Sequence, residues 1–313
     1  MLSKPITERL QWFERLAEQH IVTQRIVDTT LAEKNIYWDI LRTDLIHPVC
    51  SGNKFFKLKY YLLDAIQKKH TRIITYGGAW SNHIAATAFA AEYCGLKSLG
   101  IVRGEKPALM SETLVAAARE GMELQFMARE EFDEYAMKTS ENPHGYVIPQ
   151  GGYGKLGARG ASEMIRFIKE DYTHICCACG TGTMLAGLIS AFSGSFTHGK
   201  KHPRFIGIPI VKDPDLRQHV ENLMQPGDSA PFSLVNDYQF GGYAKKTAAL
   251  IAFMNSFYIR HQVPTDFVYT AKLMYALDDM LHSGFFPAGS RILAIHSGGL
   301  QGNKSLKKGT LCY

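Results

Sequence analysis

Residues 51–59 of this 313-residue chain read SGNKFFKLK, which sets two lysines three positions apart directly after a Gly-Asn turn. Lys54 and Lys57 lead into apolar residues at positions 58, 61, 62, 65 and 66, a spacing typical of a helix. Both amines can therefore lie on one face of the first helical turn. Charge complementarity does not explain them there, because cations oppose the helix dipole at an N-terminus.

Two interpretations of this lysine pair are open. Taken alone, the segment is more typical of a helix that begins with solvated basic residues. The alternative is chemical: one amine binds a carbonyl carbon and the other faces an anion. The second interpretation requires an anion-binding site elsewhere in the chain, so the rest of the sequence decides between them.

The composition is that of a folded protein large enough for two lobes, with 46% hydrophobic and 20% charged residues. The formal net charge is +6, and the basic residues are scattered along the sequence. This pattern predicts attraction to small anions and argues against a nucleic-acid-binding surface. We therefore expect a small-molecule substrate and no nucleic-acid partner.

The sequence also predicts neither export nor membrane insertion. Residues 1–18 carry charges where a signal peptide would be apolar, and no run reaches the roughly 18 apolar residues of a membrane span. Six cysteines in such a chain are typical of reduced thiols, so we expect a cytoplasmic protein. Cys177 and Cys179 are more typical of small residues in a buried strand than of a metal site, and no metal is expected.

Short strand-like runs alternate with amphipathic helical segments from about residue 73 onward. This alternation predicts an α/β fold with open, twisted, mostly parallel sheets flanked by helices. Four of the predicted strands end in glycine-bearing turns, which are Gly77-Gly78, Gly151-Gly152, Gly180-Thr181-Gly182 and Gly298-Gly299. Ligands of such sheets bind at the carboxyl ends of the strands, so these turns are expected to line one rim.

The turn at 180–183 has the composition of an anion cradle. Gly180 and Gly182 let backbone N–H groups converge at a helix start, and Thr181 and Thr183 add hydroxyl donors. We favour phosphate binding over a ligand-free turn. The spacing matches neither the Walker A loop nor the Gly-x-Gly-x-x-Gly of dinucleotide-binding folds, so a nicotinamide dehydrogenase is disfavoured. Viewed locally, Ser81 is best explained as a helix N-cap, and nothing distinguishes Tyr243 or Tyr269.

Taken in order, six motifs resemble one family. They are Gly52-Asn53-Lys54-x-x-Lys57-Leu58, Gly77-Gly78-x-x-Ser81-Asn82-His83, Pro149-x-Gly151-Gly152, Gly180-Thr181-Gly182-Thr183, Val268-Tyr269-Thr270-x-Lys272 and His296-Ser297-Gly298-Gly299. The family is the pyridoxal-phosphate enzymes of the tryptophan synthase β-like fold. Within it, the chain resembles the 1-aminocyclopropane-1-carboxylate (ACC) deaminase and D-cysteine desulfhydrase group.

The resemblance implies a role for each matching residue, with pyridoxal 5′-phosphate as the cofactor. Lys54 would form the Schiff base, and Lys57 would contact the phosphate. The other implied cofactor contacts are Cys179, Gly180, Thr181, Gly182 and Thr183 at the phosphate, Asn82 at the 3′ oxygen, and Thr270 and Ser297 at the pyridine nitrogen. Ser81, Tyr243 and Tyr269 would face the substrate, a small amino acid.

The resemblance also implies an activity. ACC deaminases typically carry a glutamate after the motif tyrosine, where this chain has Thr270. A hydroxyl at the pyridine nitrogen moderates the electron sink and suits elimination. The leading prediction is therefore α,β-elimination from D-cysteine, giving pyruvate, ammonia and sulfide. The alternatives are ACC deamination to 2-oxobutyrate and ammonia, and a pyridoxal-phosphate-binding protein without turnover.

The same resemblance implies two lobes with the cofactor between them, and a homodimer. The large lobe would comprise residues 1–56 and 166–313, and the small inserted lobe residues 57–165. The chain departs from the group's pattern at several positions that we expect near the cofactor or the substrate rim. These are Phe55-Phe56, Ile84-Ala85-Ala86, Met184 and Ala244-Lys245.

Overall fold

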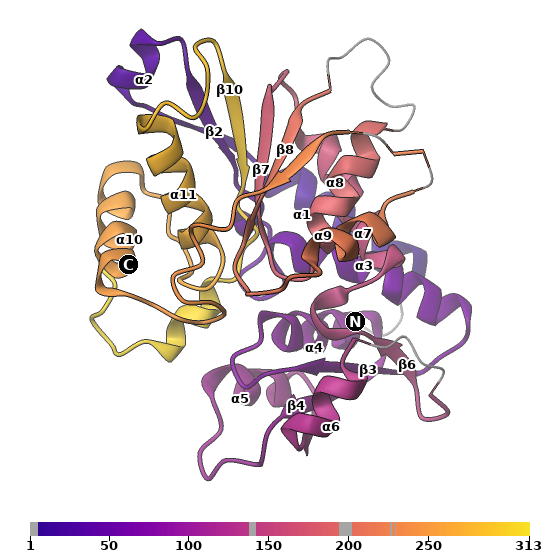
Figure 1. The fold of residues 1–313 in the computed structure, drawn as a ribbon. Helices are drawn as coiled ribbons and strands as arrows, with labels where there is room; N and C mark the ends of the chain where they lie inside the picture. Colours follow the sequence, from indigo (N-terminus) through magenta and orange to yellow (C-terminus); the bar gives the residue numbers. More distant parts are fainter. Residues whose placement is uncertain (1–5, 138–141, 194–201, 226, 229) are drawn as a thin grey trace.

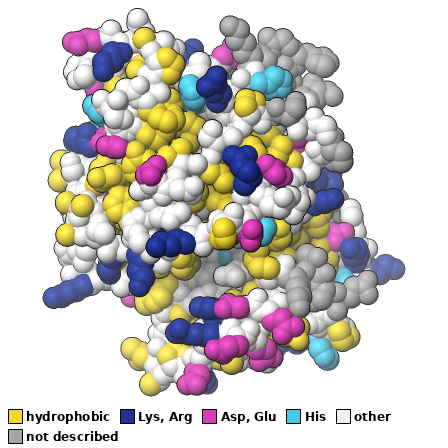
Figure 2. Space-filling view, in the orientation of Figure 1, with side chains coloured by type: hydrophobic (Ala, Val, Ile, Leu, Met, Phe, Trp, Pro, Cys, Tyr) yellow, Lys and Arg dark blue, Asp and Glu magenta, His cyan; other side chains and the backbone are white. Residues whose placement is uncertain are grey.

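Two sheets flanked by helices form the fold, as the sequence predicts (Figure 1). The computed structural model describes residues 6–137, 142–193, 202–225, 227–228 and 230–313. In the described part of the chain, no helix is both long and apolar enough to cross a membrane. Over the face drawn in Figure 2, Lys and Arg side chains are interspersed with acidic ones and form no basic stripe.

The larger sheet has six strands in the order β1-β2-β10-β7-β8-β9. Its strands are β1 (Thr23–Ile26), β2 (Tyr37–Leu41), β7 (His174–Cys179), β8 (Arg204–Pro209), β9 (Phe232–Leu234) and β10 (Arg291–Ile295). All neighbours are parallel except β1, which pairs with β2 in the antiparallel sense. The chain therefore enters the sheet at its edge and returns to its centre with β10.

The smaller sheet has four parallel strands in the order β5-β4-β3-β6. They are β3 (Arg72–Gly77), β4 (Lys97–Arg103), β5 (Met122–Met127) and β6 (Tyr146–Ile148). All four fall inside the range predicted for the small lobe, while the boundaries of the two lobes remain a prediction. This sheet lies in the lower part of Figure 1, below the larger one.

Eleven helices connect the described strands. They are α1 (Ile6–His20), α2 (Thr29–Glu33), α3 (Gly52–Gln67), α4 (Asn82–Cys94), α5 (Glu112–Arg119), α6 (Arg129–Tyr135), α7 (Lys155–Ser162), α8 (Thr183–Ser193), α9 (Leu216–Leu223), α10 (Ala248–His261) and α11 (Thr270–His282). Short 3₁₀ turns follow β2, β6, α7 and β10, at Thr43–Leu45, Gln150–Gly152, Glu163–Phe167 and Leu300–Ser305.

Strand β7 is buried on both faces, which explains its unbroken apolar sequence. Cys177 and Cys179 point into the core beside α3 and α8, whereas Cys176 and Ala178 point into the core beside α10 and α11. Strand alternation thus divides one short run between two hydrophobic cores. The two helical layers lie on opposite sides of the large sheet in Figure 1.

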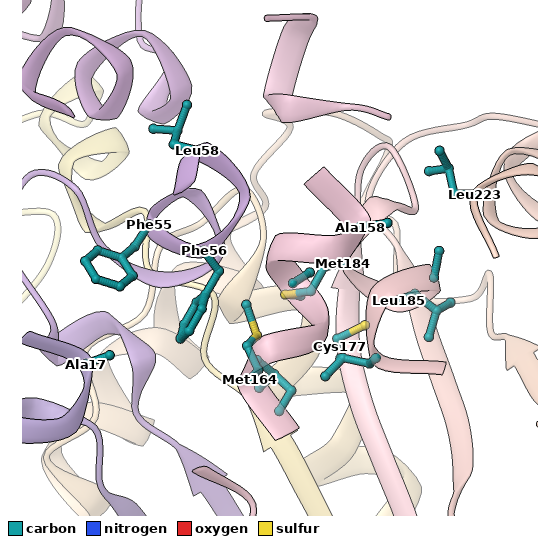
Figure 3. Close-up of a cluster of buried hydrophobic side chains, with 14 of the residues drawn as sticks. Ala17, Phe55, Phe56, Leu58, Ala158, Met164, Cys177, Met184, Leu185 and Leu223 are labelled. Atoms are coloured by element: carbon teal, nitrogen blue, oxygen red, sulfur yellow. The ribbon is translucent and has the colours of Figure 1, made fainter. Parts of the chain in front are cut away.

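Glycines allow α7 to pack closely against its neighbours. A Cβ on Gly160 would lie 2.1 Å from the carbonyl oxygen of Phe56 in α3, and one on Gly187 would lie 2.2 Å from that of Ala158. Alanine at either position therefore requires the helices to separate. Figure 3 shows the resulting core, in which Phe55 and Phe56 extend from α3 toward the helical segment that carries Met164.

The structure differs from the sequence-based expectations mainly at the N-terminus, where no element was predicted before residue 51. Here α1, β1, α2 and β2 form. Helix α7 ends at Ser162, and the chain continues as the 3₁₀ turn Glu163–Phe167. No role is predicted for Lys59 from the sequence. In the structure this lysine is 8% exposed and forms ion pairs with Glu163 at 2.8 Å and Glu14 at 3.1 Å.

The close packing of α7 predicts that Gly160→Ala destabilises the fold by about 1–3 kcal/mol, the usual cost of overpacking. Urea unfolding measures this change in free energy. Gly78→Ala is the matched control, because nothing lies within 4 Å of a Cβ added there. Equal stability of the two variants would contradict the packing described for α7.

Candidate active site

A cavity of about 550 Å³ lies at the carboxyl ends of strands from both sheets. Segments that follow β3, β6, β7 and β8 contribute to its wall, together with the first turn of α3. This is the rim at which the glycine turns were expected to meet. The predicted site residues on its wall are Lys54, Lys57, Ser81, Asn82, Cys179, Gly180, Thr181, Gly182, Thr183, Tyr243 and Tyr269.

The first turn of α3 sits directly against the end of β10. Gly52 has a φ of +59°, and a Cβ there would lie 1.9 Å from the carbonyl oxygen of Ser297. The N–H of Asn53 donates to that same oxygen at 3.2 Å. Glycine is required here because both the backbone conformation and the close approach exclude a side chain. The contact fixes where the helix, and with it the lysine pair, begins.

Lys54 and Lys57 both face the cavity, so the interpretation as a solvated helix start is wrong. The Nζ of Lys54 donates to Asn53 Oδ1 at 2.9 Å and lies 5.9 Å from the centre of the Tyr269 ring. Lys57 is 3% exposed, and its Nζ donates to the carbonyl oxygen of Gly151 at 3.3 Å. Helical spacing brings the two amines into one cavity, as predicted.

Three basic side chains are crowded at this end of the cavity. Burial lowers the pKa of Lys54 to about 8, partly opposed by the negative charge of Asp266. Burial, and then the neighbouring charge of Lys54, lowers the pKa of Lys57 well below its usual value. His83 has a pKa lowered well below its usual value by burial and by both lysines. Such a cluster favours the binding of an anion, which would relieve the mutual repulsion.

The cavity wall at the start of α8 has the form of an anion cradle. Gly182 has a φ of +73°, and the hydroxyl groups of Thr181 and Thr183 lie 2.8 Å apart. The first N–H groups of a helix lack partners within the helix and carry partial positive charge. Lys57 faces the same cavity and adds a full positive charge when protonated. These groups suit a phosphate.

Asn82 offers an open hydrogen-bonding group beside Lys54. Its amide oxygen is buried and has no hydrogen-bond partner among the described residues. A buried polar atom left unpaired is costly, so a ligand that bonds to this amide would offset the cost. The cradle, the basic cluster and this amide together fit a ligand that carries both a phosphate and a second polar oxygen.

Ser81 and two tyrosines complete the wall. Ser81 caps α4, where its Oγ accepts the N–H of Ile84 at 3.2 Å, as expected for an N-cap. The Tyr243 and Tyr269 rings meet edge to face with centroids 6.2 Å apart. Burial, and then the neighbouring Tyr243, raises the pKa of Tyr269 well above its usual value. The Tyr269 phenol therefore keeps its proton and can donate a hydrogen bond.

The two hydroxyls predicted at the pyridine nitrogen differ in their surroundings. Ser297 is 7% exposed and lines a recess of about 10 Å³ beside Lys54. Thr270 is fully buried, and its hydroxyl donates to Asp266 Oδ1 at 2.8 Å. The cofactor contact of each remains a prediction.

Sequence reasoning missed Asp266, which is fully buried close to Lys54. Its carboxylate accepts the backbone N–H groups that open α11, from Val268 at 2.9 Å, Tyr269 at 3.0 Å and Thr270 at 2.9 Å. An aspartate just ahead of a predicted helix is a capping signal that could have identified it. His83 belongs to the motif at 77–83 but was given no role, although it lines the cavity and its Nε2 lies 2.8 Å from Thr75 Oγ1.

Most departures from the group's pattern do not lie at the rim, contrary to our expectation. Phe55 and Phe56 are 2% and 3% exposed and pack in the core on the face of α3 that turns away from the lysines. Ile84, Ala85 and Ala86 are buried as well. Of the residues at these positions, Met184 and Ala244 line the cavity. More of the residues that differ from the group's pattern therefore lie in the hydrophobic core than on the cavity wall.

Comparison with known proteins agrees with this geometry. The family model described as pyridoxal-phosphate dependent enzyme matches residues 40–298. An Arabidopsis thaliana protein named bifunctional D-cysteine desulfhydrase/1-aminocyclopropane-1-carboxylate deaminase, mitochondrial, is 29% identical, covering 84% of this chain and 72% of its own. A Bradyrhizobium protein (strain ORS 278) named 1-aminocyclopropane-1-carboxylate deaminase is 28% identical, covering 79% and 81%. The crystal structure of an ACC deaminase homologue superposes with a TM-score of 0.75 at 26% identity, covering 93% and 95%.

The pKa of Lys54 predicts its reactivity. Because burial disfavours the charged amine, the neutral nucleophile becomes abundant above about pH 8. Labelling with trinitrobenzenesulfonate, followed by mass spectrometry of the peptide, should show a half-maximal rate near pH 8 for folded protein. The same peptide from denatured protein is the control, with a midpoint near the usual 10.5. Matching midpoints for the folded and denatured chains would contradict the burial effect.

Proposed function

Because the chain belongs to the family of pyridoxal-phosphate dependent enzymes, we propose that it eliminates sulfide from D-cysteine. Its cofactor is pyridoxal phosphate, and its activity is that of a lyase of the ACC deaminase and D-cysteine desulfhydrase type. The proposal goes one step further and names the substrate. The observation that carries it is Thr270, whose neutral hydroxyl, bonded to Asp266, stands directly after Tyr269.

The residues of the cavity fit the cofactor. Lys54 would bind its aldehyde carbon, and Lys57 with the 180–183 turn would bind its phosphate. The hydroxyl on its ring would donate to Asn82 Oδ1, the amide oxygen that has no partner among the described residues. Ser297, in the recess beside Lys54, would face the pyridine nitrogen. When bound, the cofactor supplies an electron sink for the electron pair left at the substrate's α-carbon.

The protein's own groups handle the protons. Lys54 is neutral in part near pH 8, so it can take the proton from the α-carbon. Tyr269 keeps its proton and can therefore donate a hydrogen bond to the departing sulfur, with the Tyr243 ring against its edge. Ser81 and the N-terminus of α4 are suited to the substrate carboxylate. D-Cysteine and one water then give pyruvate, ammonia and hydrogen sulfide.

The hydroxyl after Tyr269 favours D-cysteine over ACC. At this position ACC deaminases typically carry a glutamate, whereas Thr270 is neutral and bonded to Asp266. The carboxylate of Asp266 is itself occupied by the N–H groups that open α11. A site without a free acid here moderates the electron sink, which suits loss of sulfide. ACC deamination to 2-oxobutyrate is the second candidate, because relatives carry that name.

The homodimer and the cytoplasmic location expected from the sequence remain predictions. Light scattering during size-exclusion chromatography tests the first. The third alternative, a pyridoxal-phosphate-binding protein without turnover, predicts the absorbance of a lysine-bound cofactor without product from any amino acid.

A panel of D- and L-amino acids together with ACC, scored for sulfide and keto acid, tests the proposed substrate. We expect sulfide and pyruvate from D-cysteine at a kcat/KM at least about tenfold above that for ACC. Lys54→Ala should abolish turnover, and Lys68→Ala on the exposed end of α3 serves as the matched control. Preferential formation of 2-oxobutyrate from ACC would overturn the substrate. No product from any compound would favour the binding protein.

A further inference from the structure

The loop that carries Tyr243 has a strained backbone. Phe240 and Ala244 have φ values of +51° and +53°, and the two glycines between them, at 241 and 242, have φ of +88° and +110°. Residues other than glycine rarely adopt positive φ angles, so contacts with neighbouring residues must hold the loop in place. Tyr243 is 54% exposed and lies on the cavity wall, so hydrophobic packing does little to fix it.

Lys272 supplies the contacts that hold this loop. Its Nζ donates to the carbonyl oxygen of Gln239 at 2.8 Å and to that of Gly242 at 2.7 Å. The side chain is fully buried in the first turn of α11, and its pKa is lowered to about 8 by burial, against the opposing charge of Asp266. Burying an amine is costly, so its retention points to a specific task.

The position of Lys272 connects the two tyrosines of the cavity. Tyr269 directly precedes α11, and Lys272 on the same helix binds the carbonyl of the residue just before Tyr243. A second anchor joins the start of the loop to the end of β8, where Gln239 Nε2 donates to the carbonyl oxygen of Val211 at 3.1 Å. The edge-to-face contact between the two rings therefore depends on a loop bound to α11 and β8.

We propose that Lys272 is a positioning residue, whose amine holds the loop at 239–244 so that the Tyr243 phenol stays against Tyr269 in the cavity. The catalytic part of this inference rests on the proposed function, whereas the structural part does not. Lys272 acts on the reaction only through Tyr243.

Lys272→Met tests this without removing every partner of the two carbonyls. Each carbonyl also accepts a backbone hydrogen bond. The carbonyl of Gln239 accepts the N–H of Gly242 at 2.9 Å, and the carbonyl of Gly242 accepts the N–H of Lys245 at 3.2 Å. The variant should therefore fold. Lys272→Gln, which keeps an N–H donor, is the second variant in case it does not. Lys245→Met, which changes the exposed lysine directly after the loop, is the matched control.

Hydrogen exchange read by mass spectrometry gives a result that does not require activity. In Lys272→Met, amides of the peptide spanning 239–246 should exchange about tenfold faster, while α11 itself remains protected. Lys245→Met should leave the loop unchanged. An unchanged loop in Lys272→Met, or equal loss of protection along α11, would overturn the positioning role.

A double-mutant cycle tests the route to the reaction. Lys272→Met should lower kcat about tenfold with little change in KM, and it should cause no further loss in a Tyr243→Phe background. Equal losses in both backgrounds would show that Lys272 does not act through Tyr243. If no substrate is turned over, the proposed function fails by itself, and the exchange result still decides the structural role.

Discussion

The site depends on one constraint, which is that two amines are buried on one face of the first turn of α3. Lys54 and Lys57 gain few partners from the protein, and the charge of Lys54 adds to burial in lowering the pKa of Lys57. Burial makes Lys54 a nucleophile near neutral pH. Burial also lowers the pKa of Lys57, so an anion held at the turn 180–183 would favour its charged form. In the proposed function, covalent attachment and anion binding therefore both come from this one pair of residues.

The fold makes this arrangement possible through close backbone contacts. Gly52 lets α3 begin directly against the end of β10, and Gly160 lets α7 pack on α3 at Phe56 and Lys57. Helix α3 is thereby fixed between the two sheets, with its lysines toward the cavity and its phenylalanines toward the core. Helix α11 positions a second group of residues at the cavity. Asp266 accepts the N–H of its first residue, and Lys272 extends from it to the loop that carries Tyr243.

Much of this could be predicted from the sequence, wherever local pattern determines the result. The apolar run at 175–179 predicts a strand buried on both faces, and the spacing of Lys54 and Lys57 predicts their shared face. The elements at the N-terminus depend on distant partners instead. Strand β2 contains Asp39, an unfavourable strand residue whose charge is paired with Arg25 and bonded to Tyr172. Lys272 likewise acquires its partners from residues at least 30 positions away, which no local pattern reveals.

The central claim is that Lys54 holds pyridoxal phosphate covalently while the turn at 180–183 binds its phosphate. Reconstitution with the cofactor, reduction with borohydride and mass spectrometry of the digested protein test it most directly. The account predicts one added cofactor per chain, located on the peptide that contains Lys54. A modification at another lysine, or no uptake of the cofactor, would contradict it.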